Sequence, residues 1–118
     1  MSEPFVTCII PVYNGERFLA ASIESLFAQT RPIDEIIVVD DGSTDGSAAV
    51  ARSFGDAITY VHQENAGPVV ARNRGLAAAA GDFISFCDAD DLWEPRKLEQ
   101  QLLHFAERPE LGYVVGHV

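Results

Sequence analysis

Four consecutive apolar residues stand between carboxylates in the run Glu35–Asp40 (EIIVVD), and this run sets narrow limits on the fold. Continuous apolarity, as opposed to strict alternation, is typical of a strand that is covered on both faces. Such strands occur in parallel sheets, because the helices that connect parallel strands pack on both sides of the sheet. We therefore predict a mostly parallel sheet with helices on each face.

The rest of the chain repeats this alternation of apolar runs and helical patterns. We predict strands at 6–12, 35–40, 58–62, 83–87 and 113–118, with helices at about 16–29, 47–54, 67–80 and from near Pro95 to Pro109. Asn14 is a suitable N-cap for the first helix, and Gly81 is placed to close the third. The βαβαβαβαβ order predicts an α/β fold with three layers, α/β/α.

The length of 118 residues fits one domain, and a hydrophobic content of 47% is enough for a core. A formal net charge of -10 argues against nucleic-acid binding, which needs a basic face, and against docking on anionic membranes. No apolar run approaches the ~20 residues of a membrane span, and no signal peptide is visible, so we expect a cytoplasmic protein. Cys8 and Cys87 lie in apolar runs and are expected to be reduced core thiols.

Polar residues gather directly after the predicted strands, at 11–16, 40–45, 63–67 and 88–91. Ligands of parallel sheets bind at the carboxyl ends of the strands, where these segments come together. We therefore expect the functional site at this edge of the sheet.

Three carboxylates fall within four residues at Asp88, Asp90 and Asp91. If the segment is extended, Asp88 and Asp90 point the same way, and two hard oxygen ligands on one face suit Mg²⁺ or Mn²⁺. A solvated acidic turn before the last helix is the alternative interpretation.

Asp40 and Asp41 end a strand, where a carboxylate can accept hydrogen bonds from a base or ribose. An Asx turn in the DDGS segment is the alternative. The loop does not have the spacing of an EF-hand calcium site. Arg72 could pair with a diphosphate or with a nearby carboxylate, and Tyr13 could stack on a base or form part of the rim.

Two alternative functional classes are also compatible with acids at strand ends. The dinucleotide, P-loop and nucleophile-elbow motifs are absent. An aspartate-based phosphoryl-transfer domain would need a catalytic lysine, and Lys97 is the only lysine. A non-catalytic assembly module acting through an open edge strand is a further alternative.

Four segments together resemble family 2 glycosyltransferases, an inverting group with a GT-A fold. They are IIPVYNGERFLAASIESLFAQT, EIIVVDDGSTDGS, ENAGPVVARNRGLAAAAGDFISFCDADD and LWEP, and they occur in the family's order over nearly the whole chain. The resemblance implies a Rossmann-like nucleotide-binding half with strand order 3-2-1-4. It also implies a nucleotide-diphospho-sugar donor, with a UDP-sugar favoured, bound with Mn²⁺ or Mg²⁺.

The same resemblance assigns roles on the base side of the site. Pro11 and Tyr13 would line the base pocket. Asp41 would accept the ring N–H of the base, and Asp40 would support its loop. Arg72 would lie near the base and the diphosphate.

On the metal side, the segment Asp88-Ala89-Asp90 matches the family's DXD motif. The resemblance implies that Asp88 faces the ribose and that Asp90 is the main metal ligand, with Asp88 and Ala89 close to the substrate. The metal would offset the charge of the leaving group.

The family's general base is an acidic residue farther along the chain than Val118. We therefore expect residues 1–118 to be a single, C-terminally truncated donor-binding domain with little or no turnover alone. The expected acceptor is a saccharide or a lipid-linked saccharide. The apolar run at 113–118 could also form a homodimer through an exposed edge strand.

Overall fold

A computed structural model describes residues 4–107 of the chain. Within them, one parallel sheet has the strand order β3-β2-β1-β4. The strands are β1 (Val6–Val12), β2 (Glu35–Asp41), β3 (Thr59–Gln63) and β4 (Phe83–Phe86). The helices are α1 (Glu16–Phe27), α2 (Ser47–Arg52), α3 (Pro68–Ala78) and α4 (Lys97–Glu107), with a 3₁₀ turn at Gly55–Ala57. The predicted strand at 113–118 and the helix end at Pro109 lie outside the described residues.

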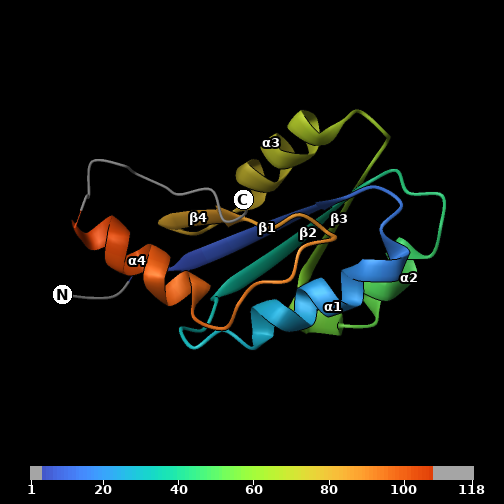
Figure 1. Cartoon of the computed structure of the whole chain (residues 1–118). Helices are drawn as coiled ribbons and strands as arrows, with labels where there is room; N and C mark the ends of the chain where they lie inside the picture. Colours follow the sequence, from blue (N-terminus) through green and yellow to red (C-terminus); the bar gives the residue numbers. More distant parts are fainter. Residues whose placement is uncertain (1–3, 108–118) are drawn as a thin grey trace.

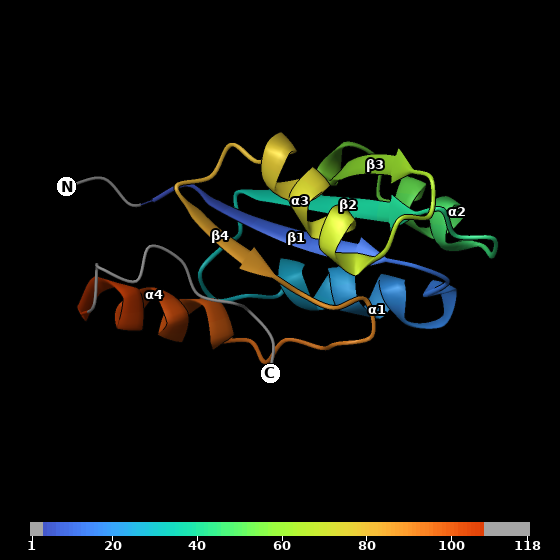
Figure 2. The same ribbon diagram turned by 90° about the horizontal axis from the view of Figure 1, so that it is seen from above.

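The sheet is covered on both faces, which confirms the predicted three-layer α/β/α fold. The observed strand order confirms the predicted order 3-2-1-4. Helix α3 lies on one face, and α1, α2 and α4 lie on the other (Figures 1 and 2). Strand β2 has two neighbours in the sheet and a helical layer on each side, which explains its uninterrupted apolar run.

The larger core lies between the sheet and α1. Helix α1 buries Leu19, Ile23 and Leu26 on one stripe, against the inward side chains of β1 and β2. Burying a side chain of this size stabilises the fold by about 1.5 to 3 kcal/mol. The other face has a smaller core, because α3 buries only Ala71 and Gly75 against the sheet.

The strand register determines where the connecting segments meet. Val12 pairs with Asp40, and Asp41 pairs with Gln63, so β1, β2 and β3 end at nearly the same level. Strand β4 pairs with β1 as far as Phe86, and the chain then turns away from the sheet. The segments that follow all four strands therefore gather at one edge, as predicted.

Several details of the predicted helix ends differ from the structure. Helix α1 begins at Glu16 as predicted, but its N-cap is Gly15 and not Asn14, since the Asn14 side chain accepts hydrogen bonds from the next loop. Helices α1 and α2 end two residues before their predicted ends. Helix α3 ends at Ala78, before Gly81 can close it. Helix α4 begins at Lys97, because the Pro95 carbonyl instead accepts a hydrogen bond from the backbone of Thr30.

Cys8 and Cys87 are both free and buried, as predicted. Burial is the main reason that the pKa of Cys8 lies well above its usual value and that of Cys87 is raised to about 12, so neither thiol is poised to react.

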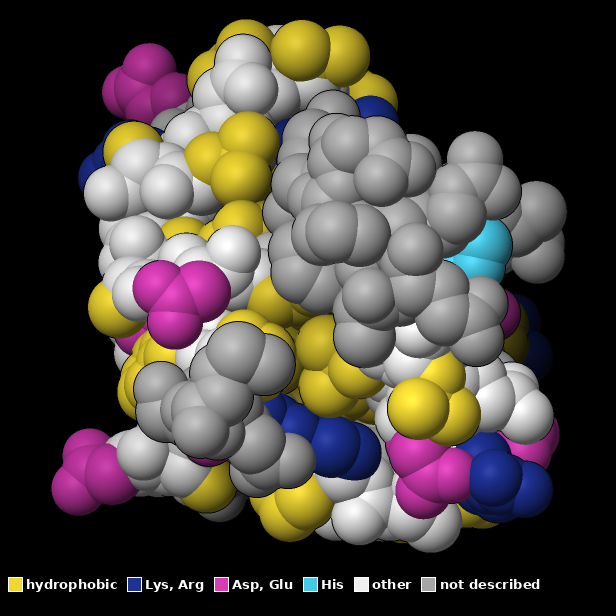
Figure 3. Space-filling view, turned by 90° about the vertical axis from the view of Figure 1, so that its left-hand side faces the viewer, with side chains coloured by type: hydrophobic (Ala, Val, Ile, Leu, Met, Phe, Trp, Pro, Cys, Tyr) yellow, Lys and Arg dark blue, Asp and Glu magenta, His cyan; other side chains and the backbone are white. Residues whose placement is uncertain are grey.

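Between residues 4 and 107, no helix is long and apolar enough to cross a bilayer. On the face shown in Figure 3, hydrophobic side chains gather near the middle, with charged side chains of both signs scattered around them.

Candidate functional site

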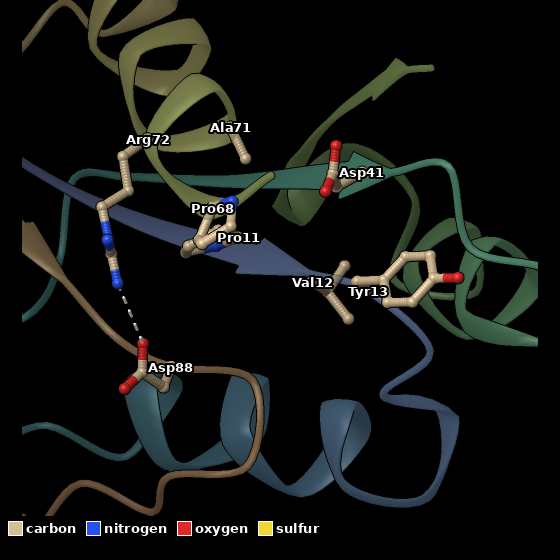
Figure 4. A pocket seen from close by; sticks show the side chains of 8 residues that line it. All are labelled: Pro11, Val12, Tyr13, Asp41, Pro68, Ala71, Arg72 and Asp88. Atoms are coloured by element: carbon tan, nitrogen blue, oxygen red, sulfur yellow. Dashed lines mark ion pairs between the residues drawn. The ribbon is translucent and has the colours of Figure 1, made fainter. Parts of the chain in front are cut away.

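A pocket opens at the carboxyl edge of the sheet, between α3 and the segments that follow β1, β2 and β4. The lining residues, drawn in Figure 4, are Pro11, Val12, Tyr13, Asp41, Pro68, Ala71, Arg72 and Asp88. Its volume of about 220 Å³ is below the ~300 to 1,000 Å³ of typical ligand pockets. It could therefore hold part of a ligand such as a base, with the remainder of a larger ligand lying outside it.

Asp41 forms one wall of this pocket, and the residue is only 4% exposed to solvent. Oδ1 accepts hydrogen bonds from Gln63 Nε2 and from the Ala66 N–H, both at 2.8 Å. Oδ2 accepts from the Gly67 N–H at 3.0 Å and from Asn65 Nδ2 at 3.2 Å. The carboxylate thus binds the segment that leads into α3, where the helix N-terminus also favours a negative charge.

These hydrogen bonds decide the charge state of Asp41. Burial by itself raises the pKa of the carboxyl, but hydrogen bonds from Gln63, Ala66 and Gly67 outweigh burial and lower the pKa below its usual value. A carboxylate has about four acceptor positions, and four protein donors already point at them. A base N–H would therefore have to share an oxygen or replace the longest of these contacts, the one from Asn65.

Asp40 points to the opposite side of β2 from Asp41 and does not line the pocket. It is 1% exposed, and its Oδ1 accepts the Ser43 N–H at 2.9 Å while its Oδ2 accepts the Tyr60 hydroxyl at 2.7 Å. Burial, followed by the bond to Asp40, raises the pKa of Tyr60 to about 12. Asp40 thus connects β3 with the loop after β2.

We expect Tyr60→Phe to lower the free energy of unfolding by about 1 to 2 kcal/mol, because it leaves a buried carboxylate oxygen without its donor. Urea unfolding checks this prediction. Tyr13→Phe is the control, since the Tyr13 ring is 53% exposed and its hydroxyl makes no hydrogen bond within residues 4–107. Equal stability of the two variants would contradict the role given to the Tyr60 hydroxyl.

Arg72 reaches across the pocket from α3 toward the segment after β4. Its Nη2 lies 3.9 Å from Asp88 Oδ1, and Figure 4 marks this ion pair. The two side chains are 36% and 41% exposed, so the pair is open to solvent and is weak. A cationic and an anionic group therefore face each other at the open side of the pocket.

The segment after β4 is not extended, so the alternative of an acidic turn describes its backbone. The Asp91 N–H donates to the Asp88 carbonyl at 3.0 Å, which closes a turn over Asp88–Asp91. The buried Ser22 hydroxyl supports this turn from α1, at 2.6 Å from the Ala89 carbonyl and 2.7 Å from the Asp91 carbonyl.

Asp90 lies on this turn with an exposed side chain, and Ala89 packs against the core below it. Neither residue lines the pocket. Among residues 4–107, no group of three or more His, Cys, Asp or Glu side chains could hold a metal ion. Two carboxylates on an exposed turn nevertheless fit a cation such as Mg²⁺ or Mn²⁺, which keeps several waters and takes further oxygens from a phosphate ligand.

The structure therefore brings together five of the predicted site residues: Pro11, Tyr13, Asp41, Arg72 and Asp88. The other three, Asp40, Ala89 and Asp90, are close in sequence to the pocket residues Asp41 and Asp88, but they do not line the pocket. Three lining residues, Val12, Pro68 and Ala71, were not predicted from the sequence. Gln63 and Asn65 were not predicted as the donors that hold Asp41. The signal in the sequence for Gln63 and Asn65 was their place in the polar segment at the end of the third strand.

A parallel sheet of order 3-2-1-4 with a pocket at its carboxyl edge is a Rossmann-like arrangement, and it matches solved structures with the GT-A fold. The model of the family "Glycosyl transferase family 2" matches residues 7–118. The chain therefore belongs to glycosyltransferase family 2, as the sequence motifs indicated.

The chain is also similar to individual sequences and solved structures. A glycosyltransferase of Rickettsia typhi is 44% identical over 100 residues, which are 85% of this chain and 31% of the relative. The mannosyltransferase PcManGT of Pyrobaculum calidifontis, solved with GDP-Man and Mn²⁺, matches with a TM-score of 0.83 and 32% identity. TarS of S. aureus, residues 1–349, solved with UDP-GlcNAc, matches with a TM-score of 0.79 and 29% identity.

The two structural matches cover 91% and 88% of this chain, but only 34% and 32% of the solved chains. The chain thus spans about a third of the length of these relatives.

Proposed function

We propose that this chain is the donor-binding part of an inverting glycosyltransferase, and that its edge pocket receives the nucleotide of a nucleotide-diphospho-sugar. A UDP-sugar is the favoured donor, because a carboxylate facing a ring N–H suits uracil. In a longer protein the sugar would pass to a hydroxyl of a saccharide or lipid-linked saccharide acceptor.

One observation carries this proposal: Asp41 of β2, Arg72 of α3 and Asp88 of the turn after β4 line the same pocket. In this proposal the base lies beside Tyr13 and Asp41, where Pro11 and Ala71 provide an apolar wall. The diphosphate then extends toward Arg72 and the acidic turn. Solved relatives with UDP-GlcNAc and with GDP-Man and Mn²⁺ support this class of ligand.

Asp88 and Asp90 are the residues that would hold a divalent cation. Such a cation, when bound, offsets the negative charge of the departing nucleoside diphosphate. Arg72 would add a second positive charge at the same end of the donor, provided that it leaves its ion pair with Asp88. Asp40 and Ala89 would act indirectly, by holding the loop after β2 and the turn after β4.

The proposal assigns no general base to residues 1–118, because the family's base lies farther along the chain. Deprotonation of the acceptor hydroxyl, and hence turnover, would require that residue. The chain by itself is therefore expected to bind donor and to transfer little or no sugar.

Donor binding predicts a cation-dependent rise in melting temperature. UDP at about 100 times its dissociation constant should stabilise the fold by ~2.7 kcal/mol, and only when Mn²⁺ or Mg²⁺ is present. Asp90→Ala should remove most of this effect. Asp56→Ala is the matched control, because Asp56 is an exposed carboxylate in the 3₁₀ turn before β3, away from the carboxyl edge. Differential scanning fluorimetry with UDP, GDP and CDP is the measurement.

Absence of a shift with every nucleoside diphosphate would contradict a competent site in this chain. An equal loss of the shift in Asp90→Ala and Asp56→Ala would contradict the metal role of Asp90. Lys97, the residue on which the phosphoryl-transfer alternative depends, does not line the pocket, and its Nζ lies 5.0 Å from the centroid of the Trp93 ring.

A further inference from the structure

Asn14 stands at the start of the loop that leaves the pocket, directly after the pocket residue Tyr13. Its backbone has a φ of 51°, and it is the one non-glycine residue with a positive φ in the part of the chain that the structure describes. Asparagine tolerates this left-handed conformation better than most residues, although it is still unfavourable. Contacts of Asn14 with its surroundings must therefore stabilise the turn.

Those contacts come from the loop after β2, about thirty residues farther along the chain. Asn14 Oδ1 accepts the Thr44 N–H at 2.8 Å and the Asp45 N–H at 3.3 Å. The Asn14 N–H donates in return to Ser43 Oγ at 2.9 Å. Asn14 thus binds the loop after β2 through both its side chain and its backbone.

Neighbouring residues extend the same connection to the two helices that follow. The Gly15 N–H donates to Ser47 Oγ at 3.0 Å, and the Glu16 N–H donates to Asp45 Oδ2 at 3.2 Å. The Gly46 N–H donates to Glu16 Oε1 at 3.1 Å. Side chains at or just before the start of α2 thereby accept hydrogen bonds from backbone N–H groups at the start of α1, and a side chain of α1 does the same for the start of α2. We call Asn14, Glu16, Ser43, Asp45 and Ser47 the loop clamp.

The loop clamp joins the two loops that carry the base side of the pocket. Tyr13 lies immediately before Asn14, and Asp41 lies two residues before Ser43. The Tyr13 ring is 53% exposed, so side-chain packing does little to fix it and its place depends on the backbone. On the other side, Ser43 is itself held by Asp40 through the Ser43 N–H.

We propose that Asn14 is a positioning residue for the nucleotide: it fixes the loops of Tyr13 and Asp41 before the ligand arrives. This inference rests on the proposed function. Without the Asn14 carboxamide, the two loops would have to be ordered by the ligand, and that ordering free energy would be lost from binding. Two backbone hydrogen bonds are at stake, so the expected loss of affinity is about tenfold.

Three variants separate positioning from general stability. Asn14→Gly keeps the positive φ accessible but removes the acceptor oxygen, and it should weaken UDP binding in the presence of Mn²⁺ about tenfold. Asn14→Asp keeps the acceptor oxygen, so its affinity for UDP should stay within about threefold of that of the wild type.

Gln29→Ala is the matched control. It removes buried hydrogen bonds between Gln29 and both Glu94 and Leu98, at the far end of α1. This variant should lose stability and keep UDP affinity, as measured by titration calorimetry on folded protein.

Hydrogen exchange at the Thr44 and Asp45 amides, with the Tyr13 ring resonances, gives a readout that needs no ligand. Asn14→Gly should speed exchange of both amides and shift the Tyr13 signals, whereas Gln29→Ala should do neither. If the wild type binds UDP and Asn14→Gly binds it equally well, the inference is overturned. If the wild type does not bind, the proposed function fails. In that case the Tyr13 ring resonances and the amide exchange rates still test whether Asn14 fixes the two loops. If the Tyr13 and Thr44 signals of Asn14→Gly equal those of the wild type, Asn14 does not fix them.

Discussion

Replacing Asp41 by alanine is expected to lower the free energy of unfolding by about 3 kcal/mol and the melting temperature by about 10 °C or more. The variant leaves three donors without an acceptor, namely the buried Gln63 side chain and the N–H groups of Ala66 and Gly67. Asn65 Nδ2 loses its contact with the carboxylate but still donates to the backbone carbonyl of residue 41. Each buried donor that loses its partner costs about 1 to 3 kcal/mol, less where water can reach it. Guanidinium unfolding and differential scanning calorimetry measure the change.

The same carboxylate predicts how stability depends on pH. The pKa of Asp41 is lower in the folded chain than in the unfolded chain, where it is about 3.9. The unfolded chain therefore binds more protons in acid, and stability must rise with pH through this range. The contribution of Asp41 is fully present above about pH 5 and is lost as the pH falls below 4 toward the folded pKa. Asp34 and Asp45, whose pKa values are also lowered, act in the same direction.

Asp41→Asn distinguishes the charge from the shape of the side chain. It retains one acceptor oxygen, but its amide group faces two of the donors, so we expect a loss of about 2 kcal/mol. Its stability should also fall less steeply between pH 5 and pH 3 than that of the wild type. An acid transition in Asp41→Asn as steep as in the wild type would show that Asp41 is not a main source of the pH dependence.

Gly42→Ala is expected to cost about 3 kcal/mol and to distort the pocket. Gly42 has a φ of 73°, a conformation that costs an alanine roughly 1 to 2 kcal/mol. The added Cβ would also lie 2.7 Å from the backbone N of Asn65, which belongs to the segment that binds Asp41. A backbone atom cannot move aside as a flexible side chain can, so the segment before α3 must shift.

Gly55→Ala is the matched control for this variant. Gly55 has a φ of 58°, and a Cβ there would meet nothing within 4 Å. It should therefore show the cost of the backbone conformation alone, about 1 to 2 kcal/mol. Chemical denaturation compares the two variants, and ¹⁵N–¹H spectra should show shifted Asn65 to Gly67 amides in Gly42→Ala only. If the two alanines cost the same, the close approach of Gly42 and Asn65 is not important for stability.

Much of the architecture could be predicted from the sequence, because it follows from local chemistry. The apolar run of β2 indicates burial on both faces, and the stripe of Leu19, Ile23 and Leu26 indicates an amphipathic α1. These patterns depend only on the periods of strands and helices. Polar segments after each strand then place the site at the carboxyl edge by a general property of parallel sheets.

The errors and omissions share one cause, which is pairing between residues far apart in the sequence. Asn14 resembles an N-cap locally, yet its oxygen accepts from Thr44 and Asp45 in another loop. Asp41 resembles an acid that accepts hydrogen bonds from a ligand, yet residues 63–67 supply four hydrogen bonds to it. An acidic run after β4 could be extended or turned, and the Ser22 hydroxyl of α1, which lies 2.6 Å from the Ala89 carbonyl and 2.7 Å from the Asp91 carbonyl, supports the turn.

By itself, the sequence determined the fold class, the family and the edge of the sheet at which the candidate pocket lies, since periodicity and motif spacing are local properties. The tertiary structure decided which side chains reach the pocket and which of their oxygens remain accessible. A hydrogen bond is satisfied by the nearest suitable partner in space, and the local sequence does not specify which distant segment provides it.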